Sequence, residues 1–149
     1  MRRFPVHSVD DAPKAAIAEH GSFDARTREA IALAVGAADN CAYCQSEHTA
    51  AGQAVVWGLE HTVALRDGTQ VDGEDKLAAL LAVTRQIAGN VGEVHEDTWQ
   101  QALHAGWTVE QLAELFTHVV ANLFTNYFNH YAHTELDIPA APGLTGVTA

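Results

Sequence analysis

Both cysteines of this 149-residue chain fall in a single run, CAYCQSEH, which begins at Cys41. Cys44 follows three residues later, and His48 follows Cys44 by four residues. On a helix this spacing places the three side chains on one face. Two thiols beside a base can reduce a peroxide and close a disulfide, and the same set can also ligate zinc. The run therefore predicts either redox or metal chemistry.

Glu29, twelve residues before Cys41, adds a carboxylate that bears on both interpretations. In the redox case His48 takes the proton of Cys44, and the thiolate attacks the O–O bond of a peroxide; the resulting sulfenic acid then condenses with the neighbouring thiol. Glu29 can orient His48 or pass protons to Cys41. In the metal case Glu29 or a water completes a zinc site. We favour the redox pair and keep the zinc site and a chemically inert pair as alternatives.

The length, composition and charge of the chain limit the classes of protein to which it can belong. A length of 149 residues suffices for one domain with a sizeable core, and 48% hydrophobic with 18% charged residues is typical of a globular protein. The net charge of −11 argues against nucleic acid and anionic membrane surfaces as partners. No apolar run is long enough for a membrane span, and the Arg2-Arg3 start is not followed by the apolar segment of a secretory signal. We expect a cytoplasmic protein, in which a close cysteine pair is more often catalytic or metal-binding than structural.

Helical periodicity runs through the chain, whereas the period-2 alternation of strands is nearly absent. Asp24 and Thr108 stand where N-caps are expected, and Asp39 or Asn40 is a candidate cap for the helix that holds the cysteines. The predicted helices cover residues 10–19, 25–38, 41–57, a short piece of 60–73, 75–88, 95–104 and 109–133. This pattern predicts an all-α fold, a bundle of about six to seven helices.

The last predicted helix carries two different stripes. Its apolar arc is too wide for one buried face, so we expect its aromatic side chains to lie mostly in the core and part of the arc to meet another subunit. The aromatic residues are Phe116, Phe124, Tyr127, Phe128 and Tyr131. The polar stripe consists of His118, Asn122, Asn126, Asn129 or His130, and His133. We expect this stripe to be structural, because buried polar groups find partners, and keep a pocket or interface facing the cysteine site as the alternative.

The residues Thr27-Arg28-Glu29 and the run from Cys41 to His48 together resemble the AhpD-like alkylhydroperoxidase family, part of the carboxymuconolactone decarboxylase superfamily. The resemblance extends from about residue 25 to residue 139 and includes the NYFNHY stretch of the last helix. It implies one AhpD-like domain over residues 1–149, with its core at about 25–139. It also implies an all-helical subunit that assembles into trimers or hexamers.

The activity that the resemblance implies is thiol-dependent peroxide reduction. By position, Cys44 matches the peroxidatic cysteine, Cys41 the resolving cysteine, and His48 with Glu29 the proton relay. One departure is Tyr43, which stands where the better-studied branch has a histidine. A tyrosine is no base near neutral pH, so we expect a simplified relay and a slower or differently directed peroxidase.

The leading hypothesis is an antioxidant oxidoreductase that reduces organic hydroperoxides or hydrogen peroxide through a Cys41–Cys44 disulfide. No haem, flavin or nucleotide motif is present, so we expect no cofactor and an external dithiol as electron donor. One alternative is a non-redox, decarboxylase-like enzyme that uses Glu29 and His48 on a small carboxylated substrate. Another is a redox-sensing or metal-binding module built on the same four residues.

Overall fold

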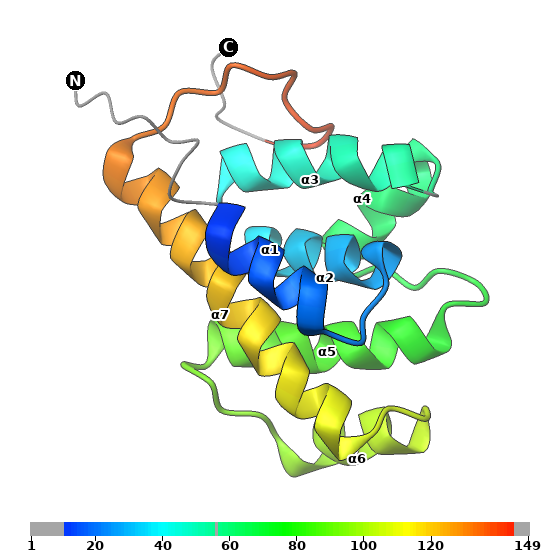
Figure 1. Ribbon diagram of the computed structural model, residues 1–149. Coiled ribbons are helices and arrows are strands. Elements are labelled where there is room, and N and C mark those ends of the chain that lie inside the picture. Colours follow the sequence, from blue (N-terminus) through cyan, green and yellow to red (C-terminus); the bar gives the residue numbers. More distant parts are fainter. Residues whose placement is uncertain (1–10, 56, 145–149) are drawn as a thin grey trace.

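Seven α-helices and no β-strand form within residues 11–55 and 57–144, the residues that the computed structural model describes (Figure 1). The helices are α1 (Asp11–His20), α2 (Ala25–Ala38), α3 (Ala42–Val55), α4 (Leu59–Asp67), α5 (Asp75–Gly89), α6 (Glu96–His104) and α7 (Val109–Ala132). The predicted all-α class with six to seven helices is confirmed. Of these seven helices, none is both long and apolar enough to cross a membrane.

Side-chain caps fix where two of the helices begin. Asp24 accepts a hydrogen bond from the backbone N–H of Thr27 at the start of α2. Thr108 and Gln111 form a reciprocal capping box at the start of α7. Both caps satisfy N–H groups that would otherwise lack a partner, and the sequence predicted both.

The start of α3 differs from the prediction. Its first helical residue is Ala42, and Cys41 stands immediately before it, with its carbonyl accepting the N–H of Gln45. Asp39 instead ends α2, where its N–H bonds to the carbonyls of the last turn. The predicted cap at Asp39 or Asn40 was therefore wrong, and a cysteine occupies the capping position.

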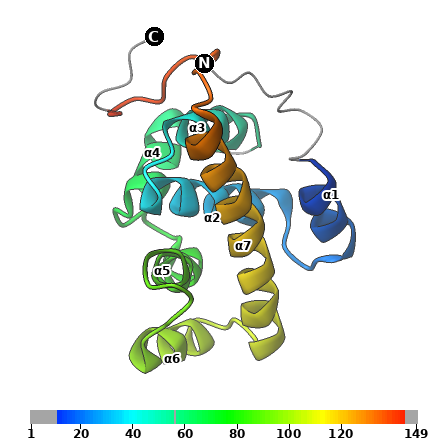
Figure 2. The ribbon, with the colours of Figure 1, turned by 90° about the vertical axis from the view of Figure 1, so that its left-hand side faces the viewer.

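The helix α2 lies at the centre of the bundle, where it contacts α3, α4, α5 and α7 (Figure 2). Residues 30–36 are consequently all buried, whereas a surface helix buries a single stripe. Four of these seven residues are alanine or glycine, which allows close approach by the neighbouring helices. A Cβ atom added at Gly36 would meet side-chain atoms of Gln45 and Cys44 at 3.4 and 3.6 Å. The close packing of α2 thus sets where α3 and its cysteines lie.

The helix α7 buries much of its polar stripe and exposes part of its apolar arc. The buried polar side chains are His118, Asn122, Asn126 and Asn129. The exposed aromatic side chains are Phe116, Phe124, Tyr127 and Tyr131, each between 49% and 59% exposed. The expectation that these aromatics lie mostly in the core is wrong for the single chain, because Leu112, Leu115 and Val119 already fill that role.

Candidate active site

The two cysteines begin α3 as a bonded pair. Cys41 and Cys44 form a disulfide, with their Cα atoms 5.4 Å apart. Each residue is only 2% exposed, so the pair is buried in the single chain. The first turn of a helix favours a thiolate, because its free N–H groups and dipole stabilise negative charge. The structure therefore places both sulfurs at the N-terminal turn of α3.

Each sulfur also receives a hydrogen bond from a nitrogen. The backbone N–H of Cys44 donates to Sγ of Cys41 at 3.3 Å, which is the contact that an N-cap side chain makes. The side-chain amide of Asn129, on α7, donates to Sγ of Cys44 at 3.3 Å. The hydroxyl of Thr134 donates to the amide oxygen of Asn129 at 2.8 Å and so fixes which end of the amide faces the sulfur. Each of the two sulfurs thus has its own hydrogen-bond donor, a backbone N–H for Cys41 and a side-chain amide for Cys44.

The turn between α2 and α3 is held by α7. Asn40 takes a left-handed conformation at φ 52°, which asparagine tolerates better than most residues. Before it, the carboxylate of Asp39 accepts from the amide of Asn126 at 3.1 Å, and its carbonyl accepts from Nε2 of His130 at 3.0 Å. Burial raises the pKa of Asp39, although Asn126 and His130 act in the opposite direction. These contacts fix the position from which Cys41 enters α3.

Glu29 and His48 form a hydrogen-bonded pair between α2 and α3. Oε2 of Glu29 lies 2.8 Å from Nδ1 of His48. The side chain of His48 is 10% exposed and that of Glu29 is 23% exposed. The carboxylate fixes the orientation of the imidazole and leaves the other ring nitrogen for proton transfer. The sequence-based expectation that Glu29 orients His48 therefore has the geometry it requires.

A pocket of about 400 Å³ opens beside this pair. Its polar lining includes Glu29 and His48 and two members of the α7 stripe, His118 and Asn122. Apolar residues of α1, α2 and α7 complete the walls, and neither cysteine is among the lining residues. The volume falls within the range of small-molecule sites. Two members of the stripe thus line a pocket beside α3, whereas Asn126 and Asn129 have the structural partners that the first interpretation expected.

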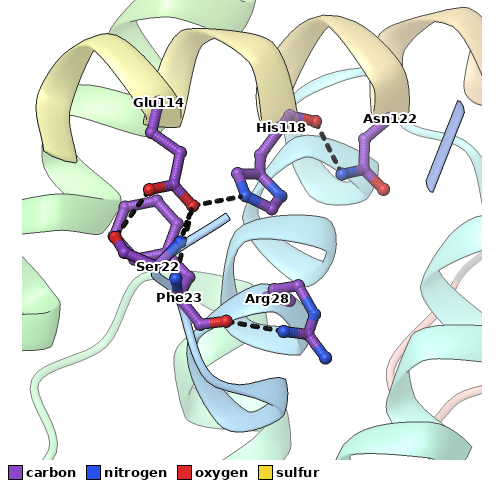
Figure 3. Close-up of polar contacts among 6 residues, drawn as sticks. All are labelled: Ser22, Phe23, Arg28, Glu114, His118 and Asn122. Atoms are coloured by element: carbon purple, nitrogen blue, oxygen red, sulfur yellow. Dashed lines mark hydrogen bonds and ion pairs between the residues drawn. The ribbon is translucent and has the colours of Figure 1, made fainter. Parts of the chain in front are cut away.

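A second histidine–carboxylate pair, Glu114 and His118, lies on α7 (Figure 3). His118 lines the same pocket. Nε2 of His118 lies 3.1 Å from Oε1 of Glu114. The carboxylate also accepts from the backbone N–H groups of Ser22 and Phe23, at 2.8 and 3.2 Å, and from the hydroxyl of Ser22 at 2.6 Å. Glu114 therefore ties the segment between α1 and α2 to α7.

The protonation of this second pair follows from its contacts. Burial alone would raise the pKa of Glu114, but the hydrogen bonds from Ser22, His118 and Phe23 outweigh it and lower the pKa. Burial lowers the pKa of His118, the charge of Arg28 adds to the effect, and Glu114 opposes it. An ionised Glu114 only accepts hydrogen bonds, so Nε2 of His118 carries the proton. At neutral pH His118 is then uncharged, and Nδ1 is an acceptor.

Asn122 and Arg28 lie beside this pair in Figure 3. The side-chain amide of Asn122 donates to the backbone carbonyl of His118 at 2.8 Å. One guanidinium N–H of Arg28 donates to the carbonyl of Phe23 at 2.5 Å. Both side chains belong to the pocket lining, so their remaining polar atoms are available to a bound molecule.

The structure brings the four predicted residues into one region, although in two parts. Glu29 and His48 share a pocket wall, and Cys41 and Cys44 form the buried disulfide at the start of the same helix that carries His48. Within residues 11–55 and 57–144, no group of three or more His, Cys, Asp or Glu side chains is arranged to hold a metal ion. The zinc alternative therefore has no donor set in that part of the chain.

Sequence reasoning missed the roles of Glu114, Arg28 and Lys14 around the pocket. The spacing of Glu114 and His118, four residues apart on a predicted helix, was the available signal for the second pair. The position of Arg28 directly before Glu29 was a weaker signal that Arg28 belongs to the site. No signal pointed to Lys14, because its place in the pocket depends on how α1 packs against α7.

Residues 7–55, which contain Glu29, both cysteines and His48, match the carboxymuconolactone decarboxylase family. A Cys-to-Ala variant of the debrominase Bmp8 in complex with 2,3,4-tribromopyrrole has a similar structure, with a TM-score of 0.73 at 14% identity over 84% of this chain and 67% of that one. The same debrominase in its apo form gives a TM-score of 0.73 at 18% identity over 87% and 69%. At these identities the similarity establishes the fold alone, and no curated protein sequence matches the chain.

Proposed function

We propose that this chain is a thiol-dependent peroxidase of the AhpD-like kind, a proposal supported by the match of residues 7–55 to the carboxymuconolactone decarboxylase family. Its substrates are organic hydroperoxides or hydrogen peroxide. The observation that carries the proposal is the Cys41–Cys44 pair at the start of α3, on the helix that also carries His48 of the Glu29–His48 pair. Those four residues supply a nucleophile, a resolving thiol and a proton relay.

The reaction proceeds from the reduced pair in two steps. The Cys44 thiolate attacks the peroxide ROOH, the O–O bond breaks, and the leaving alkoxide takes a proton from His48 to give ROH and a sulfenic acid. The Cys41 thiol then attacks that sulfur, which forms the disulfide and releases water. The N–H of Asn129 favours charge on the Cys44 sulfur at the first step.

Two electrons must then return to the disulfide. A separate dithiol reduces it by thiol–disulfide exchange and becomes a disulfide itself. We assign this donor to the cytoplasm, where small dithiol proteins are kept reduced. No resident cofactor is needed for any of these steps.

The proposal includes assembly of several copies, as a trimer or hexamer. The exposed aromatic residues of α7, Phe116, Phe124, Tyr127 and Tyr131, support it, because a monomer rarely exposes so much aromatic surface along one helix. Replacing Phe116 and Phe124 with glutamate should reduce the particle mass to that of a monomer in solution scattering. A mass unchanged by the double substitution would remove this face from the interface.

The test of the activity is turnover of cumene hydroperoxide with dithiothreitol as reductant. Cys44→Ser should abolish it, because the thiol that attacks the peroxide is removed. In the absence of dithiothreitol, reduced Cys41→Ser should consume one equivalent of peroxide and hold the product as a sulfenic acid, because no resolving thiol remains. Full turnover by Cys44→Ser would contradict the proposal, and a His104→Ala variant, changed on distant α6, serves as the control for purification.

A second candidate function is a non-redox enzyme that uses Glu29 and His48 on a small carboxylated substrate. The pocket favours it, since Glu29 and His48 line the pocket whereas the cysteines do not. In that case a Cys41→Ser, Cys44→Ser double variant keeps its activity, while Glu29→Gln loses it. In the thiol case the double variant is inactive, so the two candidates give opposite results.

A further inference from the structure

Two positively charged side chains line the pocket, and neither has a carboxylate partner among the residues that the structure describes. Lys14 enters from α1 and Arg28 from α2. One guanidinium N–H of Arg28 donates a hydrogen bond to the carbonyl of Phe23. Within the described residues, neither cation forms an ion pair. A lysine and an arginine that share a small pocket repel one another, so the arrangement favours an anion between them.

The other described cations all have structural partners. Arg26 pairs with Glu74 and stacks on Trp57, Arg66 pairs with Asp67, Lys76 lies over the ring of Trp107, and Arg85 donates to the carbonyls of Leu65 and Arg66. With a net charge of −11, the chain has far more carboxylates than positively charged side chains, so partners for ion pairs are abundant. Lys76 and Arg85 also lack an ion pair within the described residues, and Lys14 and Arg28 differ from them in that both line the pocket that holds Glu29 and His48.

The remaining charges around the pocket leave a place for an anion. Among the described residues, Glu29 is the single carboxylate in the lining, and it is bonded to His48. Glu114 lies behind His118, and its oxygens already accept four hydrogen bonds from the protein. His118 therefore presents a ring that Glu114 orients. Two cations against one carboxylate give this pocket a positive balance within an acidic protein.

The apolar part of the lining indicates the rest of the ligand. Ala15, Ile17 and Ala18 of α1 and Ala32 of α2 form the walls, with Ala121 of α7. A hydrocarbon body can thus extend from the charged end of the pocket along small and aliphatic side chains.

From this juxtaposition we infer that the pocket binds a small organic acid, with the carboxylate held by Arg28 and Lys14 and the hydrocarbon against α1 and α7. A guanidinium and an ammonium together suit a carboxylate, because both donate charge-assisted hydrogen bonds. The inference deepens the proposed function and rests on it only for the role of the ligand as substrate: the peroxide is a carboxylated hydroperoxide. Binding of the acid itself does not depend on turnover.

The binding test uses the full chain in its disulfide form and calorimetry. The probe is the para-carboxylate of cumyl alcohol, and its para-carboxamide is the neutral control. We expect the acid to bind at least about tenfold more tightly than the amide, and Arg28→Gln and Lys14→Gln each to remove most of that difference. Lys76→Gln removes the same charge outside the pocket and should leave binding unchanged.

Two results would overturn the inference. One is equal binding of the acid and the amide by the unaltered protein. The other is equal loss of acid binding in Lys76→Gln and Lys14→Gln, which would show that only the overall charge matters. Arg28→Lys accompanies Arg28→Gln because it keeps the charge if loss of the bond to Phe23 disturbs folding, and it should retain part of the binding.

A kinetic arm separates failure of this inference from failure of the proposed function. Cumene hydroperoxide and its para-carboxylate are compared as substrates of the reduced protein. We expect a KM at least about tenfold lower for the acid, with the advantage lost in Lys14→Gln while kcat changes little. If the acid binds but neither peroxide is reduced, the binding site stands and the peroxidase proposal fails. If both peroxides are reduced with equal KM, the peroxidase stands and the acid site fails.

Discussion

The two histidine–carboxylate pairs each place a histidine in one pocket but differ in how their carboxylates are held. Glu29 makes its one hydrogen bond to His48 within the described residues, and its side chain is 23% exposed. Glu114 accepts four hydrogen bonds, three of them from the segment between α1 and α2. Both imidazoles are nearly buried.

The difference indicates which pair moves protons and which one holds the structure. A carboxylate whose oxygens are saturated by donors stays ionised and fixes its histidine in one tautomer. A carboxylate bonded only to its histidine leaves the pair free to gain and lose a proton during a reaction. We therefore assign proton transfer to Glu29–His48, and assign to Glu114–His118 the positioning of α1 against α7.

The largest expected effect is on turnover. His48→Ala should reduce the rate of peroxide reduction by roughly 100-fold or more, the usual size of lost acid–base catalysis. His118→Ala is the matched control on the same pocket and should cost less than about tenfold. A steady-state comparison of the two variants measures this, and a larger loss in His118→Ala would reverse the assignment.

The next effect is on the free energy of unfolding. Glu114→Gln removes the charge from a carboxylate that accepts hydrogen bonds from two backbone N–H groups and should destabilise the protein by about 2 kcal/mol. Glu29→Gln loses a single bond and should cost about 1 kcal/mol or less. Urea denaturation of both variants gives the two values. Equal losses of unfolding free energy in the two variants would mean that the number of hydrogen-bond donors to each carboxylate does not distinguish the pairs.

A smaller effect is expected on the pH dependence of stability. The pKa of His118 is lowered from 6.5 mainly by burial, so the unfolded chain binds more protons than the folded one between the two pKa values. The contribution of uncharged His118 to the free energy of unfolding is therefore complete above pH 6.5. It is lost as the pH falls through the pKa of His118 in the folded protein. His118→Gln should therefore show a shallower loss of stability between about pH 7 and pH 5. Glu114, with a pKa lowered from 4.5, titrates below this window. A slope that does not change in the variant would contradict the neutral His118.

The smallest effect concerns one hydrogen bond of the second pair. Ser22→Ala removes the hydroxyl that donates to Oε2 of Glu114 at 2.6 Å but leaves the backbone N–H in place. Because Ser22 is exposed, we expect a loss of about 0.5–1 kcal/mol in urea denaturation and no change in turnover. A clear fall in turnover would show that the position of α1 controls the chemistry.

The fold was largely predictable because its signals are local. The Asp24 cap and the capping box at Thr108 marked where helices begin, and the Gly89–Gly92 region marked where α5 ends. The start of α3 was placed wrongly, because a cysteine is an unusual residue at a cap. The exposure of Phe116 and its neighbours on α7 could not be derived from periodicity, which shows an apolar arc but not what it faces.

The candidate site was predictable only in part, for the same reason. Glu29, Cys41, Cys44 and His48 share one helical hairpin, so their spacing in the sequence carries most of the geometry. The pocket beside them depends on α1 and α7, which are distant in the sequence and meet only in the folded chain. Their contributions therefore appeared only with the structure.

The central claim is tested most directly by the intact mass of the reduced, metal-free protein before and after one equivalent of an organic hydroperoxide. The account predicts the loss of two hydrogen atoms, as Cys41 and Cys44 close their disulfide, and no such loss in either cysteine-to-serine variant. An unchanged mass, with both thiols still free, would contradict it and leave the Glu29–His48 pair to act without them.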